Sequence, residues 1–456
     1  MRRAILIWLF SALVWTGAAL TARAQAKTPG LTLPEAVRIA LEKNPTAQAA
    51  DAYAQAVKEG IAEAKAARAP QVDFSEGFLR GNNPVFVFGT LLSQRQFTTA
   101  DFALNKLNAP TPLDDFRTQF MATLPLFDAG QTAGKIRDAK LGAASAARAS
   151  QRTRQEVIFG VVKAYVMELL ARENARVAEV TAHTAQADLE RAQARQDQGL
   201  AVPSDLLSAK VQVAQAQQDF LQARNVVALL HAAFNVAVGL AEDSSAPAEG
   251  GLAETRYEAG TLPDRQQRAL QVRPDYLEAG LGRERAENGV HMARADFLPK
   301  LSLFSSWEED NQTFAARGGN NWMFGASLNF NLFDGGAKRA RVVEARAWER
   351  QAVALAAQMA SAVRLQVREA YLNLGTAQER IQVSRAAQAE AEESLRITQN
   401  RYEAGLATIT DLLRAETAHT AAQKNYLNAL FDYRISFAAL ELATGELAPD
   451  SQAVTR

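Results

Sequence analysis

The chain of 456 residues has no cysteine, only four histidines, few aromatic residues and no excess of either charge. Without cysteine it can form no disulfide, no thiolate metal site and no cysteine nucleophile. No two histidines are spaced as metal ligands, and the sequence has neither a Ser-His-Asp order nor a phosphate-binding glycine-rich loop. We therefore predict that the protein is not an enzyme and binds no metal or cofactor.

The charge balance and the scarcity of aromatics narrow the class further. Lysine plus arginine number 50 and aspartate plus glutamate number 50, so the formal net charge is zero. Nucleic acid is not an expected partner, because neutralising phosphates requires a surplus of cationic side chains. Hydrophobic residues make up 48% of the chain but aromatics only 7%, which is typical of long helices with aliphatic seams.

Residues 1–26 have the pattern of a signal peptide. Arg2-Arg3 precede an apolar stretch, and Ala24-Gln25-Ala26 offers a cleavage site between small residues. An N-terminal membrane anchor is the alternative. Beyond Ala26 no uninterrupted apolar run reaches about 18 residues, so we expect no further membrane helix. A mature chain that crosses a membrane would then do so as part of a closed β-barrel.

The rest of the chain reads as two copies of one unit, residues 27–250 and 251–456. Pro70 recurs as Pro299, an offset of 229, whereas Leu126-Phe127-Asp128-Ala129-Gly130 recurs as Leu332-Phe333-Asp334-Gly335-Gly336, an offset of 206. The difference, 229 − 206 = 23, places 23 extra residues in the first copy between Pro70 and Leu126. Repeats of this length fix the architecture before any single motif does.

Each copy contains two segments in which apolar and polar residues alternate. In the second copy Trp322, Phe324 and Phe330 alternate with small or polar residues, which predicts strands with one apolar face. The pattern predicts four membrane strands, near residues 71–80, 116–127, 300–309 and 322–333. Each is about ten residues long, as a tilted membrane strand requires.

After the strands of each copy the pattern becomes helical and lacks proline for a long distance. We predict long helices near residues 131–239 and 337–445, each broken by a turn at Gly199 or Gly405. An unbroken stretch of ~68 residues spans about 100 Å, which is too long for a compact core. Such helices must pair in a coiled coil or an elongated bundle.

The expected fold is mainly α with a membrane β-barrel portion. Four strands from one chain cannot close a membrane barrel, whose smallest versions have about eight strands. Two chains would supply 2 × 4 = 8 strands and three would supply 3 × 4 = 12. An open sheet with an apolar face is not viable in lipid, so an obligate oligomer is expected, shaped as a tube with a membrane end.

The motifs resemble those of the TolC-like outer membrane efflux proteins over essentially the whole mature chain. The resemblance is carried, in order, by Leu31–Pro45, by Leu328–Gly336, and by Arg401–Leu406 with Asp411-Leu412-Leu413. It implies a homotrimer with a 12-stranded barrel in the outer membrane lipid, on a 12-helix barrel that extends into the periplasm. It also implies passive efflux or secretion, with an inner-membrane transporter supplying the energy and a periplasmic adaptor joining the two.

The resemblance further implies that the two helix turns form the periplasmic tip. Their residues are then a gate, formed by Asp205, Tyr402, Asp411 and Arg414, and turns that contact the adaptor, formed by Gly199, Leu200, Gly405 and Leu406. Tyr402 and Asp205 would form a clasp, and Asp411 would join an acidic ring. Ala407 and Arg414 depart from the family pattern at a gating arginine and a second acidic position.

Simpler interpretations remain open for these residues. Asp205 and Asp411 fit helix caps, Tyr402 fits ordinary packing, Arg414 fits a solvated helix position, and the glycines fit turn formers.

Two alternatives to a channel are a non-conducting envelope-spanning coiled-coil scaffold and a periplasmic adaptor. The first does not explain the amphipathic strands, and the second lacks them. The extra residues, near 81–113, are interpreted as an outer-surface loop, whose apolar Val85–Phe88 could alternatively fold over or into the barrel mouth. The sequence does not indicate a substrate or a class of pump.

Overall fold

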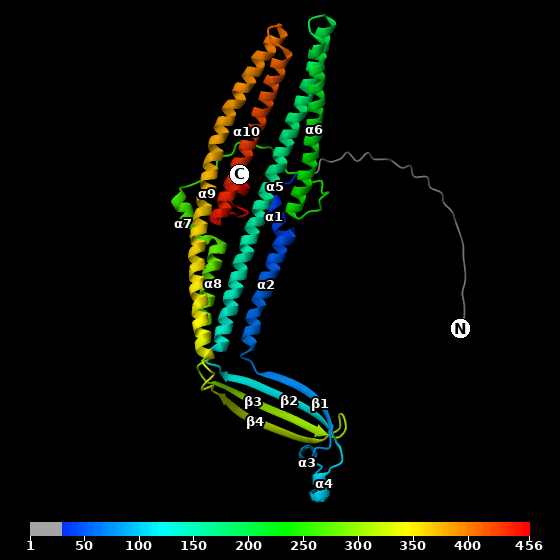
Figure 1. The fold of residues 1–456 in the computed structure, drawn as a ribbon, viewed down its shortest axis with the longest axis vertical. Helices are drawn as coiled ribbons and strands as arrows, with labels where there is room; N and C mark the ends of the chain where they lie inside the picture. Colours follow the sequence, from blue (N-terminus) through cyan, green and yellow to red (C-terminus); the bar gives the residue numbers. More distant parts are fainter. Residues whose placement is uncertain (1–29) are drawn as a thin grey trace, which may run out of the picture.

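The computed structural model describes residues 30–456, so the predicted signal peptide lies outside the described part. Long helices run side by side along the molecule, and a four-stranded sheet continues from one end of them (Figure 1). A smaller helical segment lies beyond the far end of the sheet. The helical body therefore has two ends, one joined to the strands and one formed by the two helix turns.

Four helices of the first copy correspond to four of the second and have equal lengths. They measure 11 residues in α1 (Leu33–Lys43) and α7 (Leu262–Val272), and 22 in α2 (Pro45–Ala66) and α8 (Pro274–Ala295). They measure 67 in α5 (Gln131–Asp197) and α9 (Ala337–Glu403), and 36 in α6 (Pro203–Val238) and α10 (Ile409–Thr444). A short α11 (Gln452–Thr455) closes the chain. At 1.5 Å per residue, α5 and α9 are each about 100 Å long.

The four strands pair in chain order as one antiparallel sheet, β1 (Gln71–Gly81), β2 (Leu113–Phe127), β3 (Lys300–Asn311) and β4 (Gly319–Asn329). Strands β2 and β4 therefore begin three residues before the predicted starts, and β4 ends before 330–333. Past that end the chain turns, because the Asp334 carboxylate accepts hydrogen bonds from the backbone of Gly336 and Lys338 (3.1 and 2.8 Å). These two bonds organise the entry into α9.

The helix starts and ends follow local chemistry. Asn44 caps α2 by accepting a hydrogen bond from the Thr46 backbone at 2.9 Å, and Pro45 occupies the first helical position. Helices α6 and α10 end at Gly239 and Gly445, both at positive φ. A Cβ at Gly239 would lie 2.8 Å from the Asn44 backbone nitrogen, so only glycine allows α6 to end against the α1–α2 junction.

The main hydrophobic core lies midway along the helical body. It combines residues of α1, α5, α6, α9 and α10, including the fully buried Val37, Val162, Phe234, Val363 and Phe437. Tyr165 is part of this core, and its hydroxyl donates to the Glu249 carbonyl at 2.5 Å. Tyr257 stacks on Phe437 with the ring centroids 4.1 Å apart. This core joins the two copies into one body.

Helix α6 is the one helix in residues 30–456 that is long and apolar enough by composition to cross a membrane, with a mean hydropathy of 1.2 in its most apolar window. It nevertheless packs along α5 as one arm of a hairpin. The buried Asn235 near its end donates hydrogen bonds to the carbonyls of Glu242 and Ser244 (3.1 and 2.8 Å). We therefore interpret α6 as part of the helical body.

Residues 82–112, which include the 23 extra residues of the first copy, form helices. They contain α3 (Pro84–Ser93), a 3₁₀ turn (Thr99–Phe102) and α4 (Leu104–Asn108). The Asn83 side chain accepts hydrogen bonds from the backbone of Val85 and Phe86 (3.0 and 3.2 Å), and Pro84 opens α3. The corresponding connection in the second copy, residues 312–318, has no helix.

Candidate functional site

The two helix turns form one tip, because a small hydrophobic cluster joins their hairpins. This cluster, the tip core, consists of Ala192, Leu206, Ala209, Tyr402, Ile409 and Leu412. Four helices contribute to it, α5 and α6 from the first copy and α9 and α10 from the second. The predicted gate residue Tyr402 is thus buried in the contact between the two copies.

Arg195 of α5 reaches across to Tyr402 of α9. Its guanidinium lies 4.9 Å from the centre of the tyrosine ring, and its Nη1 donates a hydrogen bond to the Tyr402 carbonyl at 2.8 Å. A cation over an aromatic face is attracted by about 0.5–2 kcal/mol. Arg195 is equivalent to Arg401 at the repeat offset of 206 residues, and this equivalence does not predict the link between the hairpins.

Tyr402 and Asp205 are neighbours but form no hydrogen bond to each other within the described protomer. Burial raises the pKa of the Tyr402 hydroxyl, the nearby Arg195 lowers it, and the negative charge of Asp205 raises it again. The phenol therefore stays protonated near neutral pH and remains a donor. The expected clasp between Tyr402 and Asp205 stays a prediction.

Asp411 is engaged in its own helix. Its carboxylate accepts hydrogen bonds from the Thr408 hydroxyl and backbone at 2.7 and 3.1 Å, while the Asp411 backbone donates to Thr408 Oγ1. This is a capping box. The hydrogen bonds from Thr408 lower the pKa of Asp411, with smaller effects of Arg414 and Arg401. The capping interpretation of Asp411 thus has direct support, and the exposed Arg414 lies near enough for its charge to act on it.

The first turn lacks such a cap. Val202 stands at the N-cap of α6, where Thr408 stands in α10, and Pro203 follows it. Among the described residues no side chain caps α6, so the Asp205 carboxylate is not used within its own helix. Asp205 is half-buried and lies beside the tip core, where it is free to act on neighbouring groups.

Both turns close in the same way. The Leu200 backbone donates to the Arg195 carbonyl at 2.8 Å, and the Leu406 backbone donates to the Arg401 carbonyl at 2.7 Å. The intervening Gly199 and Gly405 have φ of 71° and 76°, which favours glycine. The side chains of Leu200 and Leu406 are 65% and 70% exposed, so each turn presents an apolar residue to the outside.

A carboxyl pair lies next to the tip core on α5 and α10. Asp188 is buried and accepts a hydrogen bond from Arg191 at 2.7 Å. Burial, followed by a hydrogen bond with Asp188 and its charge, raises the pKa of Glu416 to about 8, and Arg191 opposes this. Glu416 therefore keeps its proton at neutral pH and can donate a hydrogen bond to the Asp188 carboxylate.

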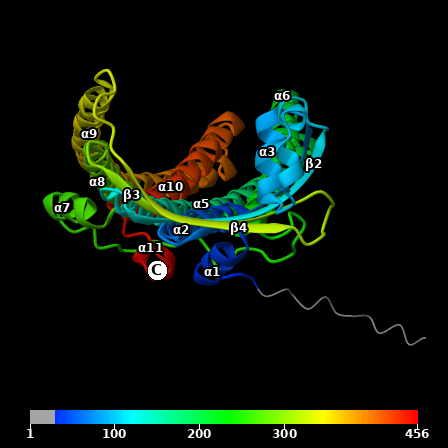
Figure 2. The ribbon, with the colours of Figure 1, turned by 90° about the horizontal axis from the view of Figure 1, so that it is seen from below.

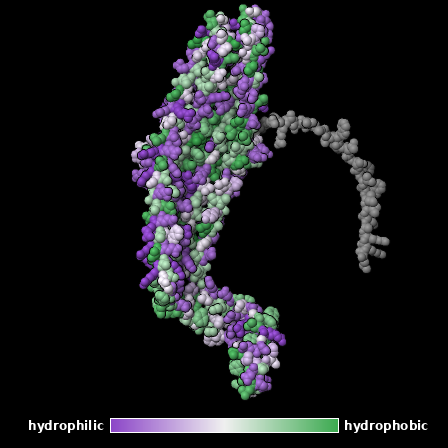
Figure 3. All heavy atoms as spheres, viewed as in Figure 1, coloured by the Kyte–Doolittle hydropathy of each residue, from purple (hydrophilic) through white to green (hydrophobic). Residues whose placement is uncertain are grey.

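At the opposite end of the body, the sheet has one apolar face. Four aromatic residues stand in register across all four strands, Phe74, Phe120, Trp307 and Trp322. The ring centroids of Phe74 and Phe120 lie 5.2 Å apart, and those of Phe120 and Trp307 lie 5.9 Å apart. Trp322 is 78% exposed. In the surface view, apolar residues gather over the strands and the helical segment beyond them (Figure 3).

A row of polar residues crosses the apolar face, Glu76, Thr118, Glu309 and Asn320, and the other face is mixed. Glu76 lies on the apolar face, where its carboxylate accepts a hydrogen bond from Thr118 at 2.6 Å. The opposite face carries Arg117, Glu308 and Asp310 toward the end of the sheet far from the long helices. Within residues 30–456 no group of three or more histidine or carboxylate side chains is arranged to hold a metal ion.

Comparison with known proteins places the chain in a family. The sequence profile of the outer membrane efflux protein family matches residues 36–239 and 266–446. Protein CyaE of Bordetella pertussis is 30% identical over 71% of this chain and 69% of its own. The alkaline protease secretion protein AprF of Pseudomonas aeruginosa is 25% identical over 98% of this chain and 89% of its own.

A solved structure shares the fold. The outer membrane protein VceC of Vibrio cholerae matches with a TM-score of 0.74 at 21% identity, covering 91% of this chain and 96% of its own. The matches confirm the resemblance, the location and the export function predicted from the sequence. The chain therefore belongs to the outer membrane efflux protein family, as an outer membrane channel protein that extends into the periplasm.

Proposed function

We propose that three copies of this chain close a 12-stranded barrel in the outer membrane on a 12-helix tube in the periplasm. The observation that carries the proposal is the open four-stranded sheet, whose edge strands β1 and β4 each have one side without a partner strand among the described residues. Its exposed aromatic face suits lipid, whereas unpaired strand edges do not. Pairing β4 of one protomer with β1 of the next protomer gives both edge strands a partner.

Exposed apolar residues on the helices support the same assembly. Leu221 and Leu229 of α6 are 64% and 65% exposed, and Leu365 and Leu372 of α9 are 65% and 59% exposed. They lie on the outer helices of the two hairpins, where the next copy would pack in a closed tube. Burying such side chains stabilises association by roughly 25 cal/mol per Å² of apolar surface.

The tube is a passive duct of a tripartite system. An inner-membrane transporter supplies the energy, and a periplasmic adaptor joins it to the tip. The exposed Leu200 and Leu406, with the glycine turns Gly199 and Gly405 that present them, form the adaptor contact. An apolar side chain on a tight turn suits insertion into a groove between adaptor helices.

The gate lies at the tip and involves Asp205, Tyr402, Asp411 and Arg414. Tyr402 remains a donor and Asp205 is not used by its own helix, so a modest shift brings the two into a hydrogen bond. The double variant Tyr402→Phe with Asp205→Ala should raise the conductance of reconstituted channels. Unchanged conductance would leave Tyr402 as packing and Asp205 as an ordinary helix residue.

The assembly is tested by mass and by conduction. Protein extracted from a separated outer-membrane fraction should contain three mature chains per particle by light scattering corrected for detergent, and should conduct ions in planar bilayers. Trimers that conduct nothing would favour a scaffold. A monomer in the soluble periplasmic fraction would favour an adaptor and overturn the proposal.

A further inference from the structure

The helical segment of residues 82–112, called here the outer insertion, lies at the end of the sheet far from the long helices (Figure 1). In the proposed assembly that end is the outer mouth of the barrel. The insertion joins β1 to β2, where the second copy needs only residues 312–318 to join β3 to β4. Its position and its extra length indicate a function at the outer mouth of the barrel.

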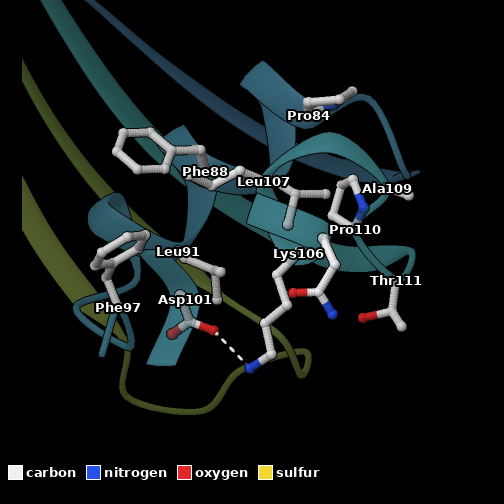
Figure 4. A pocket seen from close by; sticks show the side chains of 12 residues that line it. Pro84, Phe88, Leu91, Phe97, Asp101, Lys106, Leu107, Ala109, Pro110 and Thr111 are labelled. Atoms are coloured by element: carbon white, nitrogen blue, oxygen red, sulfur yellow. Dashed lines mark hydrogen bonds and ion pairs between the residues drawn. The ribbon is translucent and has the colours of Figure 1, made fainter. Parts of the chain in front are cut away.

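The outer insertion has a small packed interior of its own. The rings of Phe88 and Phe97 meet edge to face at 4.9 Å, and Phe97 and Phe102 do so at 5.1 Å. Asp101 accepts from Thr98 and pairs with Lys106 at 3.2 Å (Figure 4). These contacts with Thr98 and Lys106 lower the pKa of Asp101 to about 2. The segment is therefore a folded unit, with a cavity of about 270 Å³ beside these residues.

The outer insertion is attached to the face of the sheet opposite the aromatic row. Gln94 at the end of α3 is buried, and its Nε2 donates to the Asp115 carboxylate at 3.0 Å and to the Asp114 carbonyl at 2.9 Å. Arg95 donates to the Asn320 carbonyl at 2.9 Å. Because side chains alternate along a strand, Asp115 lies on the other face from Phe116. From below, α3 lies within the curve of the sheet (Figure 2).

The outer insertion rests on a seat formed by two buried carboxylates, Asp115 and Asp310, by their partner Arg117 and by the backbone at Gly319. Asp115 and Asp310 are fully buried, and Arg117 donates to both, at 3.3 and 2.7 Å. Removing one partner from such a group leaves a buried charge without an opposite charge, which strongly destabilises the folded state. The backbone also fits closely, because a Cβ at Gly319 would lie 1.8 Å from the Ser93 carbonyl oxygen. The seat spans β2, β3 and β4, so the position of the outer insertion is fixed by three strands.

We propose that the outer insertion is a lid that narrows the outer mouth of the channel and excludes bulky solutes from entering it. The proposal rests on the proposed function, because the aromatic face then meets lipid and the face that seats the lid becomes the lumen wall. Three copies related by the trimer axis would bring three lids toward one another. Solutes leaving the duct would have to displace them.

The absence of cysteine allows a direct test on whole cells. Ser306 lies on the same face as Asp310 and pairs with Met121 and Met323, so Ser306→Cys places a single thiol on the proposed lumen wall. The rate at which this thiol is labelled is measured with two reagents. One is a small charged maleimide, and the other is a maleimide attached to a polyethylene glycol chain of several kilodaltons. The ratio of the two rates reports access through the mouth and cancels the reactivity of the thiol.

The lid is loosened by Gln94→Ala with Arg95→Ala, which removes the side-chain hydrogen bonds that it donates to β2 and β4, including the one to Asp115. The ion pairs of Arg117 with Asp115 and Asp310 stay in place. Arg80→Ala is the matched control, because Arg80 pairs with Asp114 of β2 at 3.1 Å, at the same end of the sheet, and this ion pair joins two strands rather than the lid to the sheet. A variant with residues 85–111 replaced by a short glycine-serine linker removes the lid altogether.

The loosened variant should label with the bulky reagent at least about tenfold faster, since losing three hydrogen bonds shifts an open population by that order or more. Labelling by the small reagent should change little, and the control should match the parent. Bulky labelling that is as fast in the parent as in the lidless variant would overturn the lid. A thiol that the small reagent cannot reach from outside would instead overturn the proposed channel.

Discussion

The two tip turns occupy equivalent positions in the two repeats but hold the tip in different ways. In the first, Arg195 crosses to the other hairpin and contacts Tyr402, whereas its equivalent Arg401 reaches only the Leu406 carbonyl of its own turn, at 3.5 Å. In the second turn Thr408 and Asp411 form a capping box, whereas the first has Val202 at that position. One turn is thus stabilised locally and the other through its neighbour.

Because of this difference, one turn can keep its shape while the other responds to separation of the hairpins. In a symmetric tip each turn would have to do both. A turn with its own cap keeps its shape when the hairpins move apart. A turn held by a cross-hairpin contact changes its environment when they do. We therefore expect the first turn to move in opening and the second to act as a fixed reference, with the Arg195–Tyr402 contact as the link that breaks.

The largest expected effect comes from removing that link. Arg195→Ala loses a cation–aromatic contact and a charged hydrogen bond, together worth about 2 kcal/mol. Single-channel conductance should rise because the hairpins separate more readily. Arg401→Ala is the matched control, since it removes the repeat-equivalent arginine, whose hydrogen bond stays within its own turn. Equal conductance of the two variants would contradict the assigned difference between the turns.

An intermediate effect is expected from exchanging the caps. Thr408→Val should destabilise the start of α10 by about 1 kcal/mol, as loss of an N-cap does. Hydrogen exchange of the first-turn amides of α10 should accelerate accordingly. Val202→Thr in the first turn tests the converse and should slow exchange at the start of α6. No change in either variant would show that the two turns are equally stable without the cap.

The smallest effect is expected from the carboxyl pair beside the tip core, because Glu416 is partly exposed and solvent screens it. The pKa of Glu416 is raised from 4.5 to about 8 in the folded chain. The folded state therefore binds the proton more tightly than the unfolded state. Its stabilising contribution is complete below about pH 4.5 and is lost as the pH rises through about 8.

Hydrogen exchange in α5 and α10 near the tip should consequently accelerate as the pH is raised through this range, after correction for the intrinsic rate. Glu416→Gln should remove this dependence, since the amide cannot ionise. Glu403→Gln, an exposed position on α9, is the control and should leave the dependence in place. A pH profile unaffected by Glu416→Gln would show that the pair does not hold the tip.

The sequence was informative wherever the pattern was long and repeated. Periodicity and the two-copy offset anticipated the long helices, the turns at Gly199 and Gly405, and the four strands. It was uninformative where a side chain acts across copies: nothing near Arg195 reveals that it contacts Tyr402, 207 positions away. Spacing along the chain carries no signal for such a contact.

The helices of the lid were missed for a different reason. Asn83-Pro84 is the same helix-start signal as Asn44-Pro45, with the asparagine side chain capping and the proline at the first helical position. The signal was present and could have predicted α3. What the sequence did not contain was the seat, because Asp115, Arg117 and Asp310 come together only when β2 pairs with β3.

Gly239 and Gly445, which end α6 and α10, determine where the two hairpins are held. Gly239 meets the backbone at Asn44, and Gly445 meets the backbone at Arg273, so closely that a Cβ on either glycine would lie 2.8 Å from that backbone. Each hairpin is thus held at the main core, which α10 joins from Ala429 onward, and the rest of α10 forms an arm of about 30 Å to the tip. Pivoting such an arm by about 10° would carry the tip roughly 5 Å sideways. In the proposed trimer, such a pivot would widen the aperture at the tip while the membrane end stays still.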